Sequence, residues 1–442
     1  MSNRRLPVPR AQGHGAVCPT QSEGMRSGRH TVDLVVVAGA MGLSAGQLNG
    51  VLGPVASINQ VALAGLYFVG LLLLALNWHH AVPVAARGAP LWLLLGYLFL
   101  SIAWSGFPTH TFLRSLALLC ATLFGLYAAI RLNDRDVIAC TAVGLCAMLV
   151  VSLLFAVFFP SHGLMQAPHE GALRGIFSQK NTLARAAVWS TIALVILRPA
   201  TRAGRGLRVL GLAISILSLL WASSRTGLVV LVLLLLILAF SRSLAGRTRL
   251  AAVPAALVAV VIAAVLGYAV VTNRSALLEL IGRDVTLTGR TLIWVRVAEL
   301  IRLRPLLGYG YGGFWHGWDG PSWSVWALGI WNPNDSHNGF LDLVLDLGLV
   351  GLVVFGCVLA HAALKAIGRL RQSSELSAAW PLIVLTGFVL YNITESAILR
   401  PTNIMWLLFC TALFGCYRSR RCAAGTEPLT HSRHPLRSTN AS

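Results

Sequence analysis

The chain contains apolar stretches of about 20 residues that are separated by polar connectors. The candidate spans are 32–53, 57–77, 90–104, 111–130, 137–160, 182–197, 207–222, 226–241, 251–271, 338–362, 379–397 and 402–417. A helix of about 20 apolar residues is long enough to cross the hydrocarbon core of a bilayer. The apolar residues are continuous rather than alternating, which argues against a β-barrel. The sequence therefore predicts an all-α polytopic membrane protein with about twelve transmembrane helices.

The composition agrees with a membrane location. Only 11% of the 442 residues are charged and 56% are hydrophobic, whereas roughly 25% of a soluble domain is charged. The formal net charge of +20 would suggest nucleic acid binding in a soluble protein. Here most of the Lys and Arg residues lie in short connectors and tails, where the positive-inside rule accounts for them. We therefore expect membrane lipids, and no nucleic acid, as partners.

Connectors rich in Lys and Arg alternate with connectors poor in them. The basic connectors hold Arg87; Arg131 and Arg135; Arg198, Arg202, Arg205 and Arg208; Arg242, Arg247 and Arg249; Lys365, Arg369 and Arg371; and Arg418, Arg420 and Arg421. Since basic connectors stay in the cytoplasm, both termini are predicted to be cytoplasmic. The chain then divides into a disordered cytoplasmic tail (1–31), nine transmembrane helices (32–271), a long external loop (272–337), three further transmembrane helices (338–417) and a basic cytoplasmic tail (418–442).

The long loop is unusual because it carries arginines on the predicted external side, where basic residues are normally scarce. They are Arg274, Arg283, Arg290, Arg296, Arg302 and Arg304. Apolar residues recur among charged ones over 289–303, and Pro305 follows. We expect a helix that lies on the membrane surface and ends before this proline.

Two external arginines are candidates for anion binding. Arg225 lies in a very short turn, where it is either an interfacial anchor that reaches lipid phosphate or a fixed clamp for an anion, since guanidinium binds phosphate bidentately. Thr288 could cap the surface helix, which would place Arg290 in the first turn. A cation is unfavourable there unless an anionic ligand binds the helix start. The alternative for Arg290 is a solvated helix face.

His337 and Asn338 lie at the start of the tenth predicted span. With Ser336 or Asp335 as N-cap, His337 would occupy the first turn and face an external pocket. A neutral imidazole there suits a general base near neutral pH. A capping or packing role is the alternative.

A further basic segment, with Arg174, Lys180 and Asn181, precedes the sixth span, and interfacial anchoring is its alternative role. Acidic residues occur near the same side, at Asp342, Asp346 and Glu395. Ionisable groups inside membranes usually have a partner, so we expect these acids to pair with the external arginines. The spacing of His, Cys and carboxylates predicts no metal site, and no phosphate-binding loop is present.

Several motifs resemble the O-antigen ligase/polymerase superfamily. They are Gly289-Arg290-x-x-x-Trp294, Arg304-Pro-Leu-Leu-Gly-x-Gly310, and His337-Asn-x-x-Leu341 with Asp346-Leu-Gly-Leu-Val-Gly351. Two more, Arg174-Gly-Ile-Phe-x-x-Lys-Asn181 and Asn392-x-Thr-Glu-Ser396, are similar to the sub-group of ExoQ- or Wzy-type exopolysaccharide polymerases. The resemblance covers about 165–400. The departures are Asp346, where the family more often has Glu, and Gln179, where His is expected.

The resemblance implies a GT-C-like glycosyltransferase of the bacterial inner membrane, with an active site in the periplasm and no metal or other cofactor. Its donor is a glycan on undecaprenyl diphosphate. Arg225 and Arg290 match the arginines that hold the donor diphosphate, and His337 matches the residue proposed as base. Substrate contacts are carried over to Arg174, Lys180, Asn181, Arg304 and Asn338. Physical reasoning agrees, because a diphosphate leaving group needs fixed positive charge where negative charge develops.

Different reactions remain open at this stage. The leading hypothesis is a polymerase that transfers a growing chain onto a new lipid-linked repeat unit, with inversion at the anomeric carbon. The runner-up is a ligase that transfers finished glycan onto lipid A-core, which differs only in its acceptor. A transporter of lipid-linked sugars would show repeated halves, whereas this chain has one asymmetric external loop. A non-catalytic scaffold would tolerate the loss of His337.

Overall fold

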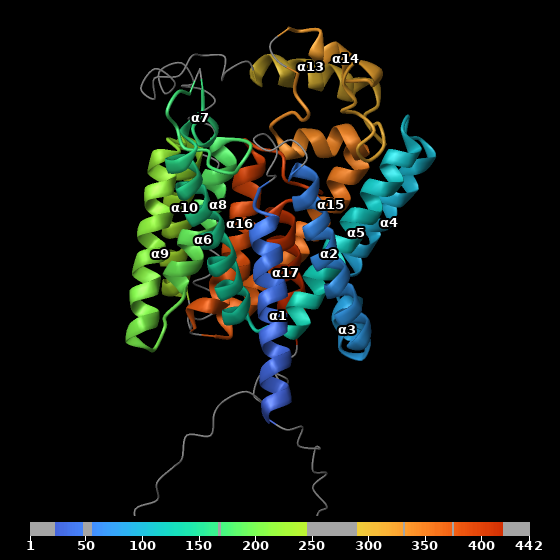
Figure 1. Ribbon diagram of the computed structural model, residues 1–442. Coiled ribbons are helices and arrows are strands. Elements are labelled where there is room, and N and C mark those ends of the chain that lie inside the picture. The colour runs from blue at the N-terminus through green and yellow to red at the C-terminus, as the bar shows by residue number, and fades with distance from the viewer. Residues whose placement is uncertain are drawn as a thin grey trace, which may run out of the picture.

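The computed structural model describes residues 23–46, 55–166, 169–244, 290–329, 332–373 and 375–418. The predicted span 251–271, Thr288 and most of both predicted tails lie outside these ranges. Within them the regular structure is helical, apart from one isolated antiparallel bridge between Leu164 and Leu173. A bundle of upright helices is topped at one end by shorter helices (Figure 1).

The bundle contains α1 (Glu23–Leu43), α2 (Val55–Leu76), α3 (Trp78–Ala86), α4 (Ala89–Leu100), α5 (Pro108–Arg131), α6 (Asp134–Phe158), α8 (Lys180–Ile196), α9 (Arg202–Trp221), α10 (Arg225–Leu244), α15 (Gly339–Arg371), α16 (Trp380–Asn392) and α17 (Ile404–Tyr417). Short 3₁₀ segments follow α4 at Ser101–Ala103 and precede α16 at Leu376–Ala379. Five of the described helices are long and apolar enough to cross a membrane, or six if α3 and α4 form one span that bends by 90°. Four further apolar helices are shorter. The chain is therefore a multi-pass helical membrane protein, and the number twelve stays a prediction.

Small residues let the bundle helices approach closely, as is usual in membranes. Between α1 and α6, a Cβ built on Gly42 would lie 2.9 Å from the carbonyl oxygen of Gly144. Between α5 and α17, a Cβ on Gly125 would collide with Cys410. These contacts leave no room for larger side chains at the two crossings.

Three shorter helices lie at the upper end of the bundle in Figure 1, namely α7 (Pro160–Gly163), α13 (Arg290–Leu303) and α14 (Trp323–Trp326). We call this end of the bundle the cap end, and we call the segment 290–329, which holds α13 and α14, the cap. The helix expected over 289–303 is observed as α13, which begins at Arg290 and ends two residues before Pro305, while its position on a membrane surface stays a prediction. Its buried residues Ile293, Val297 and Leu300 join a small hydrophobic cluster with Leu345 of α15, separate from the main core.

The helix α15 is broken at Gly348, where φ is +67°. The break frees backbone N–H groups, and the segment after α13 satisfies them: Leu349 N donates to Pro305 O at 2.8 Å and Val350 N donates to Leu306 O at 3.3 Å. In return Tyr309 N donates to Leu345 O at 2.8 Å. The cap is therefore joined to α15 through backbone hydrogen bonds at the kink.

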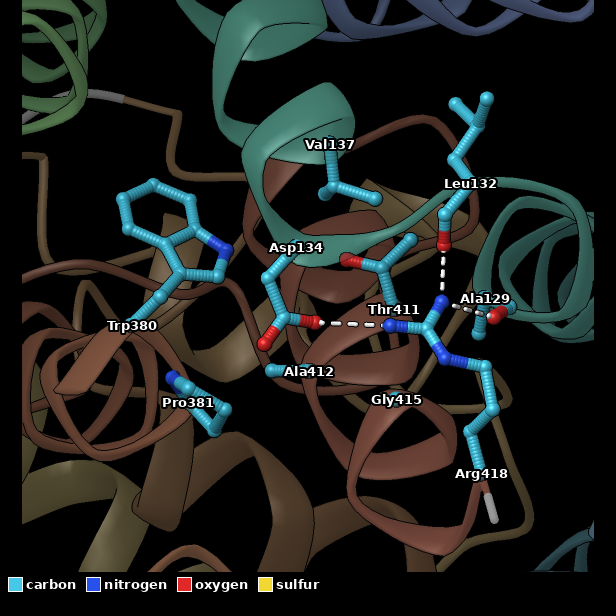
Figure 2. A pocket seen from close by; sticks show the side chains of 10 residues that line it. All are labelled: Ala129, Leu132, Asp134, Val137, Trp380, Pro381, Thr411, Ala412, Gly415 and Arg418. Atoms are coloured by element: carbon cyan, nitrogen blue, oxygen red, sulfur yellow. Dashed lines mark hydrogen bonds and ion pairs between the residues drawn. The ribbon is translucent and has the colours of Figure 1, made fainter. Parts of the chain in front are cut away.

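Ion pairs gather at the opposite end of the bundle. In Figure 2 the guanidinium of Arg418 lies between the Asp134 carboxylate, at 3.4 Å, and the carbonyl oxygens of Ala129, at 3.1 Å, and Leu132. These groups line a pocket of only about 10 Å³. Arg369 also pairs with Asp134. Arginines from the basic connectors thus meet at one end, because cations are stable at helix C-termini and beside a shared carboxylate.

Candidate functional site

Several helices begin at the cap end with a cation in the first position. Lys180 is the first residue of α8, Arg225 of α10 and Arg290 of α13. Each helix N-terminus carries unpaired backbone N–H groups and a partial positive charge. Placing cations on them is unfavourable in isolation, and together they make a region suited to an anion.

The turn after α16 links these helix starts. Glu395 Oε1 accepts a hydrogen bond from Asn181 Nδ2 at 3.3 Å and lies 3.5 Å from Arg290 Nη2. Arg290 Nη1 also donates to Thr394 O at 2.6 Å. The backbone of the turn accepts from the start of α15, since Gly339 N donates to Glu395 O at 3.1 Å. The expected pairing of Glu395 with an external arginine is confirmed.

The short turn before α10 is joined to the start of α8. Ser224 Oγ donates to Asn181 Oδ1 at 3.0 Å, and Lys180 Nζ donates to Ser223 O at 3.5 Å. Arg225 itself is exposed and forms no hydrogen bond or ion pair with other residues of the described ranges. Ser223 of the same turn, two residues before Arg225, borders a cleft of about 550 Å³, whose other lining residues are His169, Glu170, Gly171, Ala172, Lys180 and Trp221. The Arg225 guanidinium is thus available to a ligand.

The prediction for the start of α15 is wrong in one respect. The N-cap is Asn338, whose Oδ1 accepts from Phe340 N and Leu341 N, so His337 precedes the helix instead of occupying its first turn. Asn338 Nδ2 also donates to Ile393 O at 3.2 Å, and this tertiary contact selects Asn338 among the possible caps.

His337 lies beside an acid. Its Nδ1 is 3.5 Å from Asp335 Oδ1, its backbone N donates to the same oxygen at 3.0 Å, and its side chain is 18% exposed. The neighbouring Ser336 O accepts from Trp294 Nε1 of α13 at 2.8 Å. A carboxylate beside Nδ1 favours the imidazole tautomer that carries its proton on Nδ1, in which Nε2 holds the basic lone pair.

A half-buried arginine that the sequence analysis did not select supports this segment. Arg400 Nη2 lies 3.3 Å from Asp342 Oδ2 and 3.8 Å from Asp335 Oδ2. Burial by itself lowers the pKa of Arg400. The carboxylates of Asp335, Asp342 and Asp346 together raise this pKa by more than burial lowers it, so the side chain stays charged. The expected pairing of Asp342 is confirmed, while Asp346 Oδ1 finds no hydrogen-bond partner in the described structure.

Backbone strain is concentrated around the same region. Among the described residues other than glycine, positive φ occurs at Ser223 (49°), His337 (53°) and Leu399 (54°). Ser223 lies two residues before Arg225, His337 is the candidate base, and Leu399 directly precedes Arg400. Such conformations are costly and cluster at functional sites. The strain would have been a useful signal, but a sequence does not reveal it.

Two predicted residues lie apart from this network. Arg174 Nε donates to His162 O at 2.8 Å, which fixes the segment before α8 to α7. Arg304 is exposed and lies over the Tyr309 ring, 4.9 Å from its centroid. Neither forms a hydrogen bond or ion pair with the other candidate residues in the described part of the chain. In that part no three His, Cys, Asp or Glu side chains gather as a metal site would need.

The comparisons with known proteins agree with the motifs. Residues 210–356 match the family model described as O-Antigen ligase, and this segment holds Arg225, Arg290, Arg304, His337 and Asn338. The resemblance drawn from the sequence motifs is therefore confirmed.

Curated relatives come from two bacterial groups. The chain is 32% identical over 168 residues to the exopolysaccharide production protein ExoQ of Rhizobium meliloti, a match that covers 34% of this chain and 38% of ExoQ. It is 30% identical over 118 residues to a putative polysaccharide ligase of Rickettsia felis, covering 24% and 27% of the two chains. A putative polysaccharide ligase of Rickettsia prowazekii is 31% identical over 113 residues, covering 24% and 28%. The chain thus spans well under half the length of each of these relatives.

Proposed function

We propose that the chain is a membrane glycosyltransferase that polymerises undecaprenyl-diphosphate-linked repeat units into a surface polysaccharide. The observation that carries the proposal is the meeting of cationic helix starts with a His–Asp pair at one end of the bundle. The family of residues 210–356 and the similarity to ExoQ support the same class of chemistry. The protein would lie in the bacterial inner membrane with cytoplasmic termini and a periplasmic site.

The donor's diphosphate would bind between Arg225 and Arg290. Arg225 is unpaired among the described residues, and Arg290 uses only part of its five-donor guanidinium on Glu395 and Thr394. Both sit on helix N-termini, so backbone dipoles add to the side-chain charge. Charge that develops on the leaving diphosphate would be stabilised by groups that are already in place, and no metal or other cofactor is invoked.

The acceptor would be a sugar hydroxyl of a second lipid-linked repeat unit. Its oxygen attacks the anomeric carbon of the donor glycan from the face opposite the diphosphate. The bond between that carbon and the diphosphate oxygen breaks, and undecaprenyl diphosphate leaves. The hydroxyl proton goes to Nε2 of His337, while Asp335 holds the other ring nitrogen and stabilises the imidazolium. This displacement inverts the anomeric carbon.

The remaining predicted residues would have supporting roles. Lys180 and Asn181 border the anion region, and Asn338 fixes the strained His337 at the start of α15. Arg174 and Arg304 lie outside the network, so we assign them contacts with more distant parts of the glycan or with lipid headgroups.

The second candidate is a ligase that transfers glycan from undecaprenyl diphosphate to lipid A-core. The names of the Rickettsia relatives favour it, since each is a putative polysaccharide ligase. Donor binding and the base would be the same in both reactions, and only the acceptor differs.

The deciding experiment is the size and anchoring of surface glycan in a deletion strain complemented with wild type or His337→Ala. Short, single-unit glycan that only the wild type lengthens would establish a polymerase with an essential His337. Full-length glycan that stays on its carrier and never reaches lipid A-core would establish a ligase. Rescue by both proteins would eliminate the catalytic histidine.

A further inference from the structure

A buried arginine beneath the candidate site has no hydrogen-bond or ion-pair partner among the residues that the structure describes. Arg185 of α8 is 8% exposed, and it forms no hydrogen bond or ion pair within the ranges that the structure describes. An isolated guanidinium away from water is strongly disfavoured, and inside a membrane protein such a group usually has a partner or a task. A state of the protein in which Arg185 is paired is therefore expected.

Contacts one turn above and one turn below Arg185 show which part of α16 lies opposite it. One turn above it, Asn181 donates to Glu395. One turn below it, a Cβ built on Gly387 would lie 2.7 Å from the ring of Trp189. Residues four apart lie on one helix face, so Arg185 lies between these two contacts.

The α16 residue at that level is Tyr391, which lies four residues before Glu395. Its hydroxyl is buried and also has no hydrogen-bond partner in the part described. The charged groups that act on this hydroxyl are Arg185 and Glu395. Glu395 and the unpaired Arg185 guanidinium thus both lie close enough to the Tyr391 hydroxyl to act on it.

Glu395 is itself held loosely. Its contacts to Asn181 and Arg290 are 3.3 and 3.5 Å long, and both involve Oε1. Charge-assisted hydrogen bonds of good geometry are about 2.7–2.9 Å long. The Glu395 carboxylate is therefore bound only weakly to Arg290. A second cation, Arg185, lies one helical turn further into the bundle.

We propose that Arg185 is a positioning residue that receives the Glu395 carboxylate when a lipid diphosphate takes its place on Arg290. The inference rests on the proposed function, because it assumes that Arg290 binds the donor diphosphate. In the ligand-free state Glu395 neutralises Arg290. In the bound state it moves towards Arg185, so two anions never compete for one guanidinium. Tyr391 lies between the two positions and can donate to the carboxylate as it moves.

A double-mutant cycle tests the exchange. Full-length protein in lipid nanodiscs is titrated with undecaprenyl diphosphate, and undecaprenol serves as the uncharged control lipid. Arg185→Met should weaken binding of the diphosphate about tenfold or more, a usual size for coupling between sites, because Glu395 can no longer leave Arg290 for a partner. In a Glu395→Gln background the same Arg185→Met change should alter affinity by less than about threefold. Glu299→Gln, which removes an exposed carboxylate of α13, should leave binding unchanged.

Other outcomes identify the failure. Equal weakening by Arg185→Met in both backgrounds means that Arg185 touches the phosphate directly, and unchanged affinity in both means a purely structural role; either overturns the exchange. The proposed function survives either of these outcomes if Arg290→Gln abolishes binding of undecaprenyl diphosphate, because Arg290 is then still the residue that holds the diphosphate. If wild type does not distinguish undecaprenyl diphosphate from undecaprenol, both proposals fail.

An infrared measurement keeps the idea testable should Arg185→Met fail to fold. The difference spectrum of wild type minus Glu395→Gln isolates the Glu395 carboxylate stretch. Addition of undecaprenyl diphosphate should shift that band, since the counter-ion changes. A band that stays in place would overturn the exchange.

Discussion

Replacement of Gly348 by alanine should detach the cap from the bundle. The residue has φ of +67° and ψ of −169°, a conformation essentially restricted to glycine that costs a residue with a side chain about 1–3 kcal/mol. A Cβ there would also collide with Leu306 O. The segment after α13 must then withdraw, which breaks the hydrogen bonds from Leu349 N and Val350 N, each worth about 1 kcal/mol. The docking of the cap is thus weakened by about 3–5 kcal/mol in total.

Amide hydrogen exchange measures this loss. A change of about 3 kcal/mol corresponds to roughly a hundredfold faster exchange at Leu349 and Val350, if both open when the cap leaves. Gly356→Ala is the matched control on α15, because nothing lies within 4 Å of a Cβ built there. It should leave exchange at the kink unchanged. Unchanged exchange in Gly348→Ala would refute the view that the kink joins the cap to α15.

The remaining predictions concern the chemistry. Arg290→Lys should lower glycan transfer by about a hundredfold, since an ammonium cannot bind diphosphate bidentately. Arg296→Lys, on the exposed face of the same helix, is its control. Equal activity of the two variants would count against diphosphate binding by Arg290. Asp335→Asn should lower the turnover rate about tenfold or more with little change in donor affinity, because His337 loses its orienting carboxylate; a pure affinity defect would contradict this. EDTA should leave transfer intact, whereas a strict Mg²⁺ requirement would disprove a metal-independent reaction.

Some features could be predicted because they depend on residues close together in the sequence. The existence of α13 could be predicted from its mixed apolar and charged residues and from Pro305, and the structure places the end of this helix at Leu303. The spacing of Arg and Lys between apolar runs likewise separated the two ends of the bundle. The pairing of Glu395 with an arginine could be expected because buried charges in membranes need partners.

Features that depend on distant contacts could not be predicted. Asp335, Ser336 and Asn338 are all good N-cap residues, and the contact from Asn338 to Ile393 decides among them. The break in α15 requires carbonyl groups from the segment after α13, which the sequence of α15 does not contain. Arg400 looked like an ordinary residue of a short turn, and only folding brings it to Asp342.

The candidate site is built from parts that pack separately. Arg290 belongs to the cap, whose cluster is centred on Val297 and Phe314, whereas Arg225 and Glu395 belong to helices of the main core or to their connecting turns. Within α15, Leu345 packs in the cap cluster while Leu343 and Leu347 pack in the main core, so the short segment before the kink is shared by both. Because Arg290 and Arg225 lie in elements that pack in different clusters, the distance between the two arginines depends on how the cap docks on the bundle as well as on the packing within each cluster. A glycan-transfer defect in Gly348→Ala with an intact bundle would therefore be a defect of assembly, since that variant alters none of the charged groups of the site.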